Sequence, residues 1–320
     1  MKNFTANKMK YLILPLLIIL AGIVMYFVRG GFNFDVEFMG GIRMQIELGT
    51  EASNDEVTDI INTVLKDNGV EGGAVVQKSG TSATQYVVKT PNAVAVAEGS
   101  DAKTAEEALK DAVIAALTEK YGEGVSMMSV SSASASFGQA VQRKALLYTL
   151  LAIICILIYI AIRFEWRSAV MAVVALAINV LVMAAVYTIT NISINTTFIA
   201  AMLTVVGYSI NNTIVIFDRI RENMRGRKKN VTVSDVVNNS IAETMGRTIN
   251  STITTLITII LIYIIGVSTI KQFALPLIIG IIAGAYTSIF IASTFWAAWK
   301  EADMKAKAEA AAERRKNGKK

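Results

Sequence analysis

The chain has 320 residues, of which 53% are hydrophobic and 18% charged, and its mean hydropathy is +0.50. This composition is more apolar than that of an ordinary soluble protein and indicates a membrane protein. The sequence has no histidine, one cysteine (Cys155), and neither a phosphate-binding loop nor a dinucleotide-binding glycine motif. These features argue against the common metal and nucleotide sites, so we expect no cofactor, no metal site and no catalytic residues.

Six segments are apolar over the roughly 17–25 residues that a helix needs to cross a bilayer. They cover residues 11–28, 145–162, 169–189, 197–217, 248–266 and 273–299. The first follows Lys2, Lys8 and Lys10 and could imitate a signal peptide, but its apolar core is too long and "MYFVRGG" offers no small-residue cleavage site. We interpret it as a retained anchor.

Basic residues gather in alternate connections between these segments. They occur before the first span, in "RFEWRS" (residues 163–168), in residues 218–247 and in the tail from Lys300, whereas "TNISIN" and "GVSTIK" contain a single lysine between them. This distribution predicts that both termini are cytoplasmic. The net charge of +6 arises in these cytoplasmic segments, so we interpret the basic tail as contacting lipid headgroups rather than nucleic acid.

The sequence therefore predicts four parts. They are the cytoplasmic amino terminus with the first span (1–28), an extracytoplasmic domain (29–142), five further spans (143–299) and a basic cytoplasmic tail (300–320).

The extracytoplasmic domain has the pattern of an α+β fold. Residues 42–48 alternate apolar and polar side chains as a half-buried strand does, and a helix is expected after Ser53, with Glu56 completing a capping box and Gly69 ending the helix. A hairpin over residues 75–90, a second helix over 103–121 and a strand over 125–130 follow. The order strand, helix, two strands, helix, strand is the ferredoxin-like arrangement.

Two of the expected spans carry polar stripes. Thr204, Tyr208, Asn211 and Asn212 recur at helical spacing in one, and Arg247, Ser251, Thr254, Thr255 and Thr258 recur in the next, with Asn250 alongside. Lipid cannot satisfy their hydrogen bonds, so both stripes must face protein or water. They fit either hydrogen bonds between helices or a hydrated ion path. Gly280, Gly284 and Ser288 form a ridge of small residues suited to close helix packing.

Three motifs together resemble the SecF family, the smaller membrane subunit of the bacterial SecDF protein-export complex. They are "GYSINNTIVIFDRIRENMR" (207–225), "RTINSTITTL" (247–256) and "EFMGGIRMQIEL" (37–48). The resemblance implies half of a resistance-nodulation-division transporter fold with six spans, one before and five after the extracytoplasmic domain, in the cytoplasmic membrane. It implies an ion-motive force as the energy source. The implied partners are SecD, the SecYEG translocon with its other accessory subunits, the translocating preprotein and membrane lipids.

The resemblance also designates candidate site residues, each at a matching position of this sequence. The candidate ion pathway comprises Tyr208, Asn211, Asn212, Arg247, Asn250 and Thr254. The motif after the first span comprises Glu37, Phe38, Gly40 and Gly41, and the cytoplasmic end of the fourth span contributes Asp218, Arg219, Arg221 and Glu222.

Asn212 stands where the family pattern has a proton-carrying aspartate, and an amide has no carboxyl proton to release. Three mechanisms stay open: the acid of SecD carries the ion alone, Na⁺ replaces the proton because amide and hydroxyl oxygens coordinate hard cations, or the complex is uncoupled. Glu37 likewise replaces an aspartate of the family pattern. The alternative functions are a half-transporter of small molecules or lipids and a passive scaffold that holds preprotein.

Overall fold

The computed structural model describes residues 3–70, 73–78, 83–91, 102–133, 135–163, 165–228 and 230–317. Residues 79–82 of the predicted hairpin loop and residues 318–320 of the predicted tail lie outside these ranges. The chain divides into two units. The helical unit comprises Met1–Phe32, Tyr148–Ile192 and Thr197–Lys320, and the sheet unit comprises Asn33–Leu147 and Ser193–Thr196.

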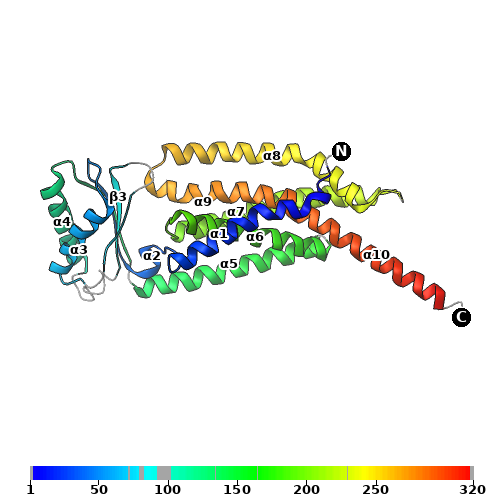
Figure 1. The fold of residues 1–320 in the computed structure, drawn as a ribbon, viewed down its shortest axis with the longest axis horizontal. Coiled ribbons are helices and arrows are strands. Elements are labelled where there is room, and N and C mark those ends of the chain that lie inside the picture. Colours follow the sequence, from blue (N-terminus) through cyan, green and yellow to red (C-terminus); the bar gives the residue numbers. More distant parts are fainter. Residues whose placement is uncertain are drawn as a thin grey trace. The chain divides into compact units, whose positions relative to one another are not determined.

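Long apolar helices make up the helical unit (Figure 1). They are α1 (Lys8–Val28), most of α5 (Ala135–Arg163), α6 (Trp166–Thr190), α7 (Thr196–Arg225), α8 (Val233–Ile265), α9 (Ser268–Tyr286) and α10 (Ser293–Asn317), with a π-helical segment (Thr287–Ala292) between the last two. A short 3-10 helix, η1 (Thr5–Asn7), precedes α1.

In the described part of the chain, five helices are long and apolar enough to cross a membrane. They lie at Thr5–Val28, Trp166–Thr190, Thr196–Arg225, Val233–Ile265 and Ile270–Ala311. The remaining predicted span coincides with a shorter apolar stretch of α5, Leu147–Ile162. These helices, together with a small sheet domain, confirm the prediction of a helical membrane protein with a sheet domain.

The basic connection predicted over residues 218–247 is largely helical, which corrects the expectation of a loop. Helix α7 continues to Arg225, because no glycine or proline occurs between Tyr208 and Arg225. Helix α8 begins after Thr232, whose hydroxyl accepts a hydrogen bond from the N–H of Asp235 (3.1 Å) while the Asp235 carboxylate accepts one from the Thr232 N–H (3.1 Å). This reciprocal cap starts the helix at Val233, 14 residues before Arg247. The two helices therefore occupy most of the segment 218–247, and only residues 226–232 separate them in sequence.

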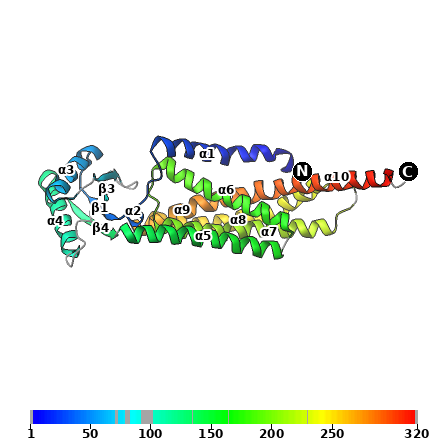
Figure 2. The same cartoon turned by 90° about the horizontal axis from the view of Figure 1, so that it is seen from below.

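Small residues allow the helices of this unit to approach closely. Helix α1 packs along α6 (Figure 2), and a Cβ placed on Gly22 of α1 would lie 2.5 Å from the Cβ of Ala185. Helix α9 packs between α6 and α8. A Cβ on Gly280 of α9 would lie 2.6 Å from Val205 and 2.7 Å from Met183. The ridge of small residues in α9 is therefore a packing surface, as predicted.

The amino-terminal segment and the first half of α10 both contact the beginning of α8. The N–H of Thr5 donates to Asn238 Oδ1 (3.0 Å), and the N–H of Ser234 donates to Glu301 Oε1 (2.8 Å) on α10. Helix α10 then projects beyond the other helices of this unit (Figures 1 and 2). The segment before α1 and the start of the tail are therefore on the same side of the helical unit.

A four-stranded antiparallel sheet with two helices forms the core of the sheet unit. In chain order its elements are β1 (Gly41–Glu47), α3 (Asn54–Asp67), β2 (Val75–Lys78), β3 (Gln85–Pro91), α4 (Ala102–Tyr121) and β4 (Ser126–Ala133). The strand order is β2-β3-β1-β4. Strand β1 therefore pairs with β3 on one side and with β4 on the other, the third and fourth strands in chain order.

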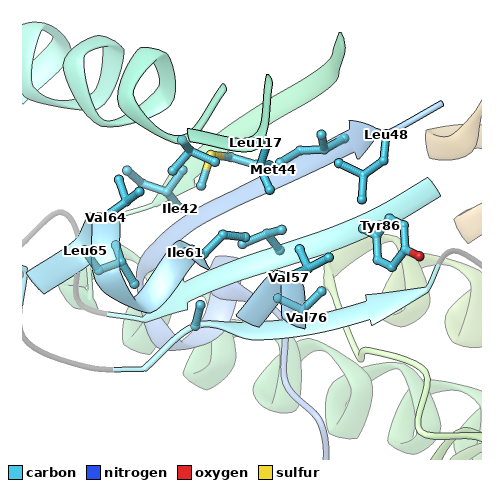
Figure 3. Close-up of a cluster of buried hydrophobic side chains, with 14 of the residues drawn as sticks. Ile42, Met44, Leu48, Val57, Ile61, Val64, Leu65, Val76, Tyr86 and Leu117 are labelled. Atoms are coloured by element: carbon cyan, nitrogen blue, oxygen red, sulfur yellow. The ribbon is translucent and has the colours of Figure 1, made fainter. Parts of the chain in front are cut away.

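One face of this sheet is covered by α3 and α4 and holds a continuous apolar core (Figure 3). Met44 and Ile46 of β1, Ile61 of α3 and Leu117 of α4 are fully buried. Burying each such side chain contributes about 1.5–3 kcal/mol. The Tyr86 hydroxyl is buried at the edge of this core, where it donates to the carbonyl of Ala52 (2.6 Å) and accepts from its N–H (2.7 Å). The core thus contains a polar group whose hydrogen bonds are satisfied.

The predicted capping box at the start of α3 is wrong. Ser53 occupies the N-cap position, but its side chain makes no capping hydrogen bond. Glu56 instead forms an ion pair with Lys120 of α4 (2.5 Å). The tertiary partner therefore replaces the local one and links the two helices that cover the sheet.

Candidate functional site

The motif after α1 forms a compact turn that leads into the sheet. Asp35 caps a short helix, α2 (Val36–Met39), by accepting the N–H of Val36 on Oδ1 (2.8 Å). Phe38 is buried at 3% exposure. Gly40 and Gly41 have φ angles of 80° and 125°, which other residues rarely adopt. The two glycines are therefore needed to turn the chain from α2 into β1.

The same motif holds the segment between α6 and α7, Ser193–Thr196, which belongs to the sheet unit. Phe34 forms a parallel bridge with Ile194. The N–H of Asp35 donates to the carbonyl of Ile194 (2.9 Å), and the N–H of Ile194 donates to the carbonyl of Asn33 (2.8 Å). We call the residues 33–37 and 193–196 together the clamp. It joins two parts of the chain that are about 160 residues apart in sequence.

Glu37 completes the clamp at the first residue of α7. Its Oε2 accepts hydrogen bonds from the N–H (2.8 Å) and the hydroxyl (2.6 Å) of Thr196. The first N–H groups of a helix have no partner within the helix, and the helix dipole favours a negative charge there. The Glu37 carboxylate therefore stabilises the beginning of α7, which is the helix that carries Asn212.

Asp35 of the clamp lies near two cationic residues, Arg43 and Lys89. Asp35 and Lys89 are nearly fully buried. Asp35 Oδ2 is 3.7 Å from Arg43 Nε and 3.9 Å from Lys89 Nζ. Lys89 also donates to Asn33 Oδ1 (3.1 Å) and to the hydroxyl of Ser193. Lys89 thus ties strand β3 to both segments of the clamp.

Arg43 and Lys89 are directly opposite one another on β1 and β3, and like charges in such a pair repel. Burial lowers the pKa of Lys89 to about 8; the negative charge of Asp35 opposes this shift, and the positive charge of Arg43 adds to it. No spacing in the sequence predicts that Asp35, Arg43 and Lys89 form a group. Asp35 precedes the short helix α2, as a capping residue does, and this position is a sequence signal for a structural role of Asp35. Lys89 lies near Asp35 only because β1 pairs with β3.

The predicted stripe on α7 divides into two faces. Tyr208 lies toward α8, where its hydroxyl contacts the Ser251 carbonyl (3.0 Å) and the Thr255 hydroxyl (3.3 Å). Asn211 is exposed, whereas Asn212 is buried at 3% exposure. The side-chain nitrogen of Asn212 has no hydrogen-bond partner among the described residues. Tyr208 and Asn212 therefore lie in different environments, although their spacing placed them on one stripe.

A buried polar cluster on the packed side of α7 was not predicted as a unit. The Thr213 and Ser288 hydroxyls are 2.8 Å apart, and the Ser288 hydroxyl also contacts the Ser209 carbonyl (3.1 Å). A Cβ on Gly284 would lie 2.9 Å from both Asn179 Nδ2 and Ser209 Oγ, so these two atoms flank the glycine. Neither atom has a hydrogen-bond partner in the described ranges, nor does Asn179 Oδ1.

Arg247 lies in a cavity with the candidate residues at the end of α7. The cavity has a volume of about 690 Å³. Its charged lining residues are Asp218, Arg219, Arg221, Glu222, Arg225, Glu243 and Arg247. Asp218 therefore lines the same cavity as Arg247, although the two residues lie on different helices.

Within this cavity Arg219 is the best-paired cation. It donates to Glu222 (2.6 Å) and to Glu243 of α8, and Glu243 also accepts from Asn223 (3.0 Å) and Asn239 (2.6 Å). Arg247 has no ion pair or hydrogen-bond partner in the described part of the chain. The described part of the chain therefore supplies no carboxylate that pairs with Arg247.

Asn250 and Thr254 lie further along α8 and do not line the cavity of Arg247. Both are exposed, and the Thr254 hydroxyl donates only to backbone carbonyls of its own helix, those of Asn250 (3.1 Å) and Ser251 (2.9 Å). With Arg247 they form an exposed polar face on an otherwise apolar helix, which we call the open face of α8.

Comparison with known proteins supports one family. Residues 113–302 match the family described as protein export membrane protein SecD/SecF, C-terminal. The chain is 34% identical over 294 residues to a protein translocase subunit SecF of Alicyclobacillus acidocaldarius, covering 90% of this chain and 89% of the relative. It is 31% identical to the protein translocase subunit SecDF of Bacillus subtilis, covering 95% of this chain but 39% of that protein.

A solved structure is similar as well. The crystal structure of SecDF from Thermus thermophilus, a translocon-associated membrane protein, has a TM-score of 0.77 and 27% sequence identity. The match covers 93% of this chain and 38% of that one, so the chain spans well under half of the SecDF proteins it resembles.

Proposed function

Because this chain belongs to the SecD/SecF family of protein-export membrane proteins, we propose that it is the SecF-type accessory subunit of the Sec translocon. In this role it promotes the movement of preproteins across the bacterial cytoplasmic membrane and catalyses no bond-breaking reaction. The observation that carries the proposal is the match to a SecF subunit over about nine-tenths of both chains.

The proposed architecture is half of a resistance-nodulation-division fold. Six spans are arranged as one before and five after a ferredoxin-like domain, with the apolar stretch Leu147–Ile162 as the short second span. The strand order β2-β3-β1-β4 supports the ferredoxin-like assignment. The proposed limits are 1–28, 29–142, 143–299 and 300–320. The basic connections support a cytoplasmic location of both termini, and the contacts of Thr5 and Glu301 near the start of α8 are consistent with termini on one side.

A SecD subunit is the proposed partner for the open face of α8. Arg247, Asn250 and Thr254 are exposed on a helix that otherwise presents isoleucines, and lipid cannot satisfy such groups. A charged side chain within a membrane is expensive unless it is paired or hydrated. SecD helices would cover this face and present an acid to Arg247. The SecYEG translocon and the preprotein complete the proposed assembly.

Ion coupling in this proposal uses the acid of SecD rather than a group at position 212. Tyr208, Asn211, Asn212, Arg247, Asn250 and Thr254 line or support the path, and Asn212 acts as a hydrogen-bonding wall. One charge that crosses 100 mV releases about 2.3 kcal/mol, which is enough to bias a conformational change.

The clamp gives this movement a route to the extracytoplasmic domain. Glu37 holds the first residue of α7, and Lys89 of β3 holds Ser193 in the same clamp. A displacement of α7 along its axis would therefore pull on the strand that pairs with β1. Phe38, Gly40 and Gly41 supply the rigid turn at this point. Asp218, Arg219, Arg221 and Glu222 form the cytoplasmic end of the same helix.

The test is preprotein translocation in vesicles that contain this chain, its SecD partner and the translocon. Translocation starts from a stalled intermediate, so that the ATP-driven motor is not limiting, and the proton and sodium gradients are collapsed separately. We expect sensitivity to the proton gradient alone. Sensitivity to sodium alone would make the polar face an ion path for Na⁺, and indifference to both gradients would leave an uncoupled scaffold. Arg247→Ala should abolish the gradient dependence, with Arg227→Ala as the control of equal charge change.

A further inference from the structure

A second cavity lies between α6, α7 and α10 at the end of the helical unit that carries Lys300. Its volume is about 460 Å³. Phe217, Ile220 and Trp296 form an apolar floor and are buried in the helical core. Arg221, Arg225 and Lys300 supply three cationic side chains to the wall. An apolar floor with a basic wall suits a ligand that is both anionic and amphipathic.

The floor contains a hydrogen-bond donor without an acceptor. Trp296 is 4% exposed, and its Nε1 has no hydrogen-bond partner among the residues that the structure describes. An indole N–H can only donate, and buried tryptophans usually find an acceptor. Trp296 is one of the residues that line the cavity, so a hydrogen-bond acceptor that enters the cavity would lie beside this side chain.

The one carboxylate of the lining is already engaged. Glu165 accepts two hydrogen bonds from Lys300 (2.8 and 2.9 Å) and one from Arg167 (2.8 Å). Burial alone would raise the pKa of Glu165, but these hydrogen bonds and charges outweigh burial and lower the pKa below its ordinary value, so the carboxylate stays ionised. Arg225 has no ion pair within the described ranges of the chain. The cavity therefore keeps an uncompensated positive charge.

The tryptophans indicate the depth of this cavity in a membrane. The chain has three tryptophans. Trp296 lines the cavity, whereas Trp166 and Trp299 lie beside Arg167, which pairs with the lining residue Glu165. The rings of Trp166 and Trp299 meet edge to face at 5.0 Å, with the Arg167 guanidinium 5.1 Å from the Trp166 ring, and Trp296 lines the cavity. Tryptophan gathers at the level of the lipid headgroups, so the cavity lies where headgroup phosphates do.

We propose that this cavity binds the headgroup of an anionic phospholipid, with Arg225 and Trp296 donating to its phosphate and ester oxygens and the apolar floor contacting the upper acyl chain. Basic pockets between membrane helices on the cytoplasmic side suit this ligand class. The site is separate from the cavity of Arg247 except for Arg221 and Arg225, which line both. Its occupation does not depend on export activity, so the failure of one proposal would not be the failure of the other.

The experiment titrates the full-length chain, in a neutral detergent, with short-chain phosphatidylglycerol, short-chain phosphatidylcholine or inorganic phosphate. The thermal unfolding midpoint and the tryptophan emission are both followed. We expect a saturable rise of the midpoint and a change of emission with phosphatidylglycerol only. Loss of a charged donor in Arg225→Gln should raise the half-saturating concentration about tenfold or more, and loss of a neutral donor in Trp296→Phe about two- to tenfold.

Lys228→Gln is the matched control, because Lys228 is exposed in the connection after α7 and lines neither cavity. It removes the same charge and should leave the half-saturating concentration within about twofold of the original. Equal responses to the two lipids, a full response to inorganic phosphate alone, or an equal loss in Lys228→Gln would each overturn the proposal. The unfolding midpoint without lipid shows whether each variant is folded.

Discussion

The carboxylate of Glu37 accepts two hydrogen bonds from Thr196, at 2.8 Å from its N–H and 2.6 Å from its hydroxyl, across 159 residues of sequence. Glu37, a residue of the motif after α1, therefore holds the first turn of α7, the helix that carries Asn212. The resemblance to SecF implies an aspartate at position 37. The glutamate of this chain has the same charge, and its carboxylate reaches the first residue of α7.

Glu37→Ala should loosen the first turn of α7. Loss of a capping group costs about 0.5–2 kcal/mol, so amide exchange of the first-turn N–H groups of α7 should become about two- to thirtyfold faster. Hydrogen exchange of the full-length chain measures this effect. Glu51→Ala is the control, because Glu51 pairs only with Lys78 on the exposed surface. Unchanged exchange in Glu37→Ala would mean that the clamp does not stabilise α7.

Lys89 should make the stability of the sheet unit depend on pH. Its pKa is about 8 in the folded protein against 10.5 when unperturbed, so the unfolded chain binds more protons between these values. The free energy of unfolding should therefore rise as the pH increases from about 8 to about 10.5, by at most about 3.5 kcal/mol at roughly 1.4 kcal/mol per pKa unit.

The measurement compares unfolding of the full-length chain with that of Lys89→Met across this pH range. The original chain should gain stability relative to the variant as the pH rises, because methionine does not titrate. Parallel pH profiles would show that Lys89 is not responsible.

Asn179→Leu should raise the stability of the helical unit. Both polar atoms of the Asn179 side chain are buried without partners in the described residues, and such groups cost about 1–3 kcal/mol. Leucine has the same branched side-chain skeleton of four heavy atoms and removes that cost, so the thermal unfolding midpoint should increase. Asn223→Leu is the contrast, because Asn223 donates to Ser240 and Glu243 and its loss should lower the midpoint. A lower midpoint in Asn179→Leu would indicate that the amide has a partner, such as an internal water molecule.

Gly284→Ala and Gly207→Ala should have opposite effects. A Cβ at Gly284 would lie 2.9 Å from Asn179 and from Ser209, which forces the helices apart at a cost of about 1–3 kcal/mol. A Cβ at Gly207 meets nothing within 4 Å, and alanine there favours the helix by up to about 1 kcal/mol. Thermal unfolding of the two variants distinguishes the positions. Equal shifts would contradict the close packing of α9 against α6 and α7.

Sequence patterns alone determined the elements and the family. Hydropathy located five helices that are long and apolar enough to cross a membrane, together with the shorter apolar stretch of α5, because apolar runs of that length have few other uses. Period-two alternation located β1, and the motifs over residues 207–225 and 247–256 resembled SecF, the family that the comparisons then confirmed. These signals are local, so each could be read without knowing what the segment contacts.

Tertiary structure alone decided which polar residues meet. Lys89 reaches Asp35 and Ser193 only because β3 pairs with β1 and the clamp closes beside them. Helical spacing put Tyr208 and Asn212 on one stripe, yet a stripe of that width covers two environments, one toward α8 and one packed inside. Asp218 comes to the cavity of Arg247 because α7 and α8 both continue as helices past the expected loop ends. Contacts between distant segments depend on how helices and strands pack, and no local spacing encodes that packing.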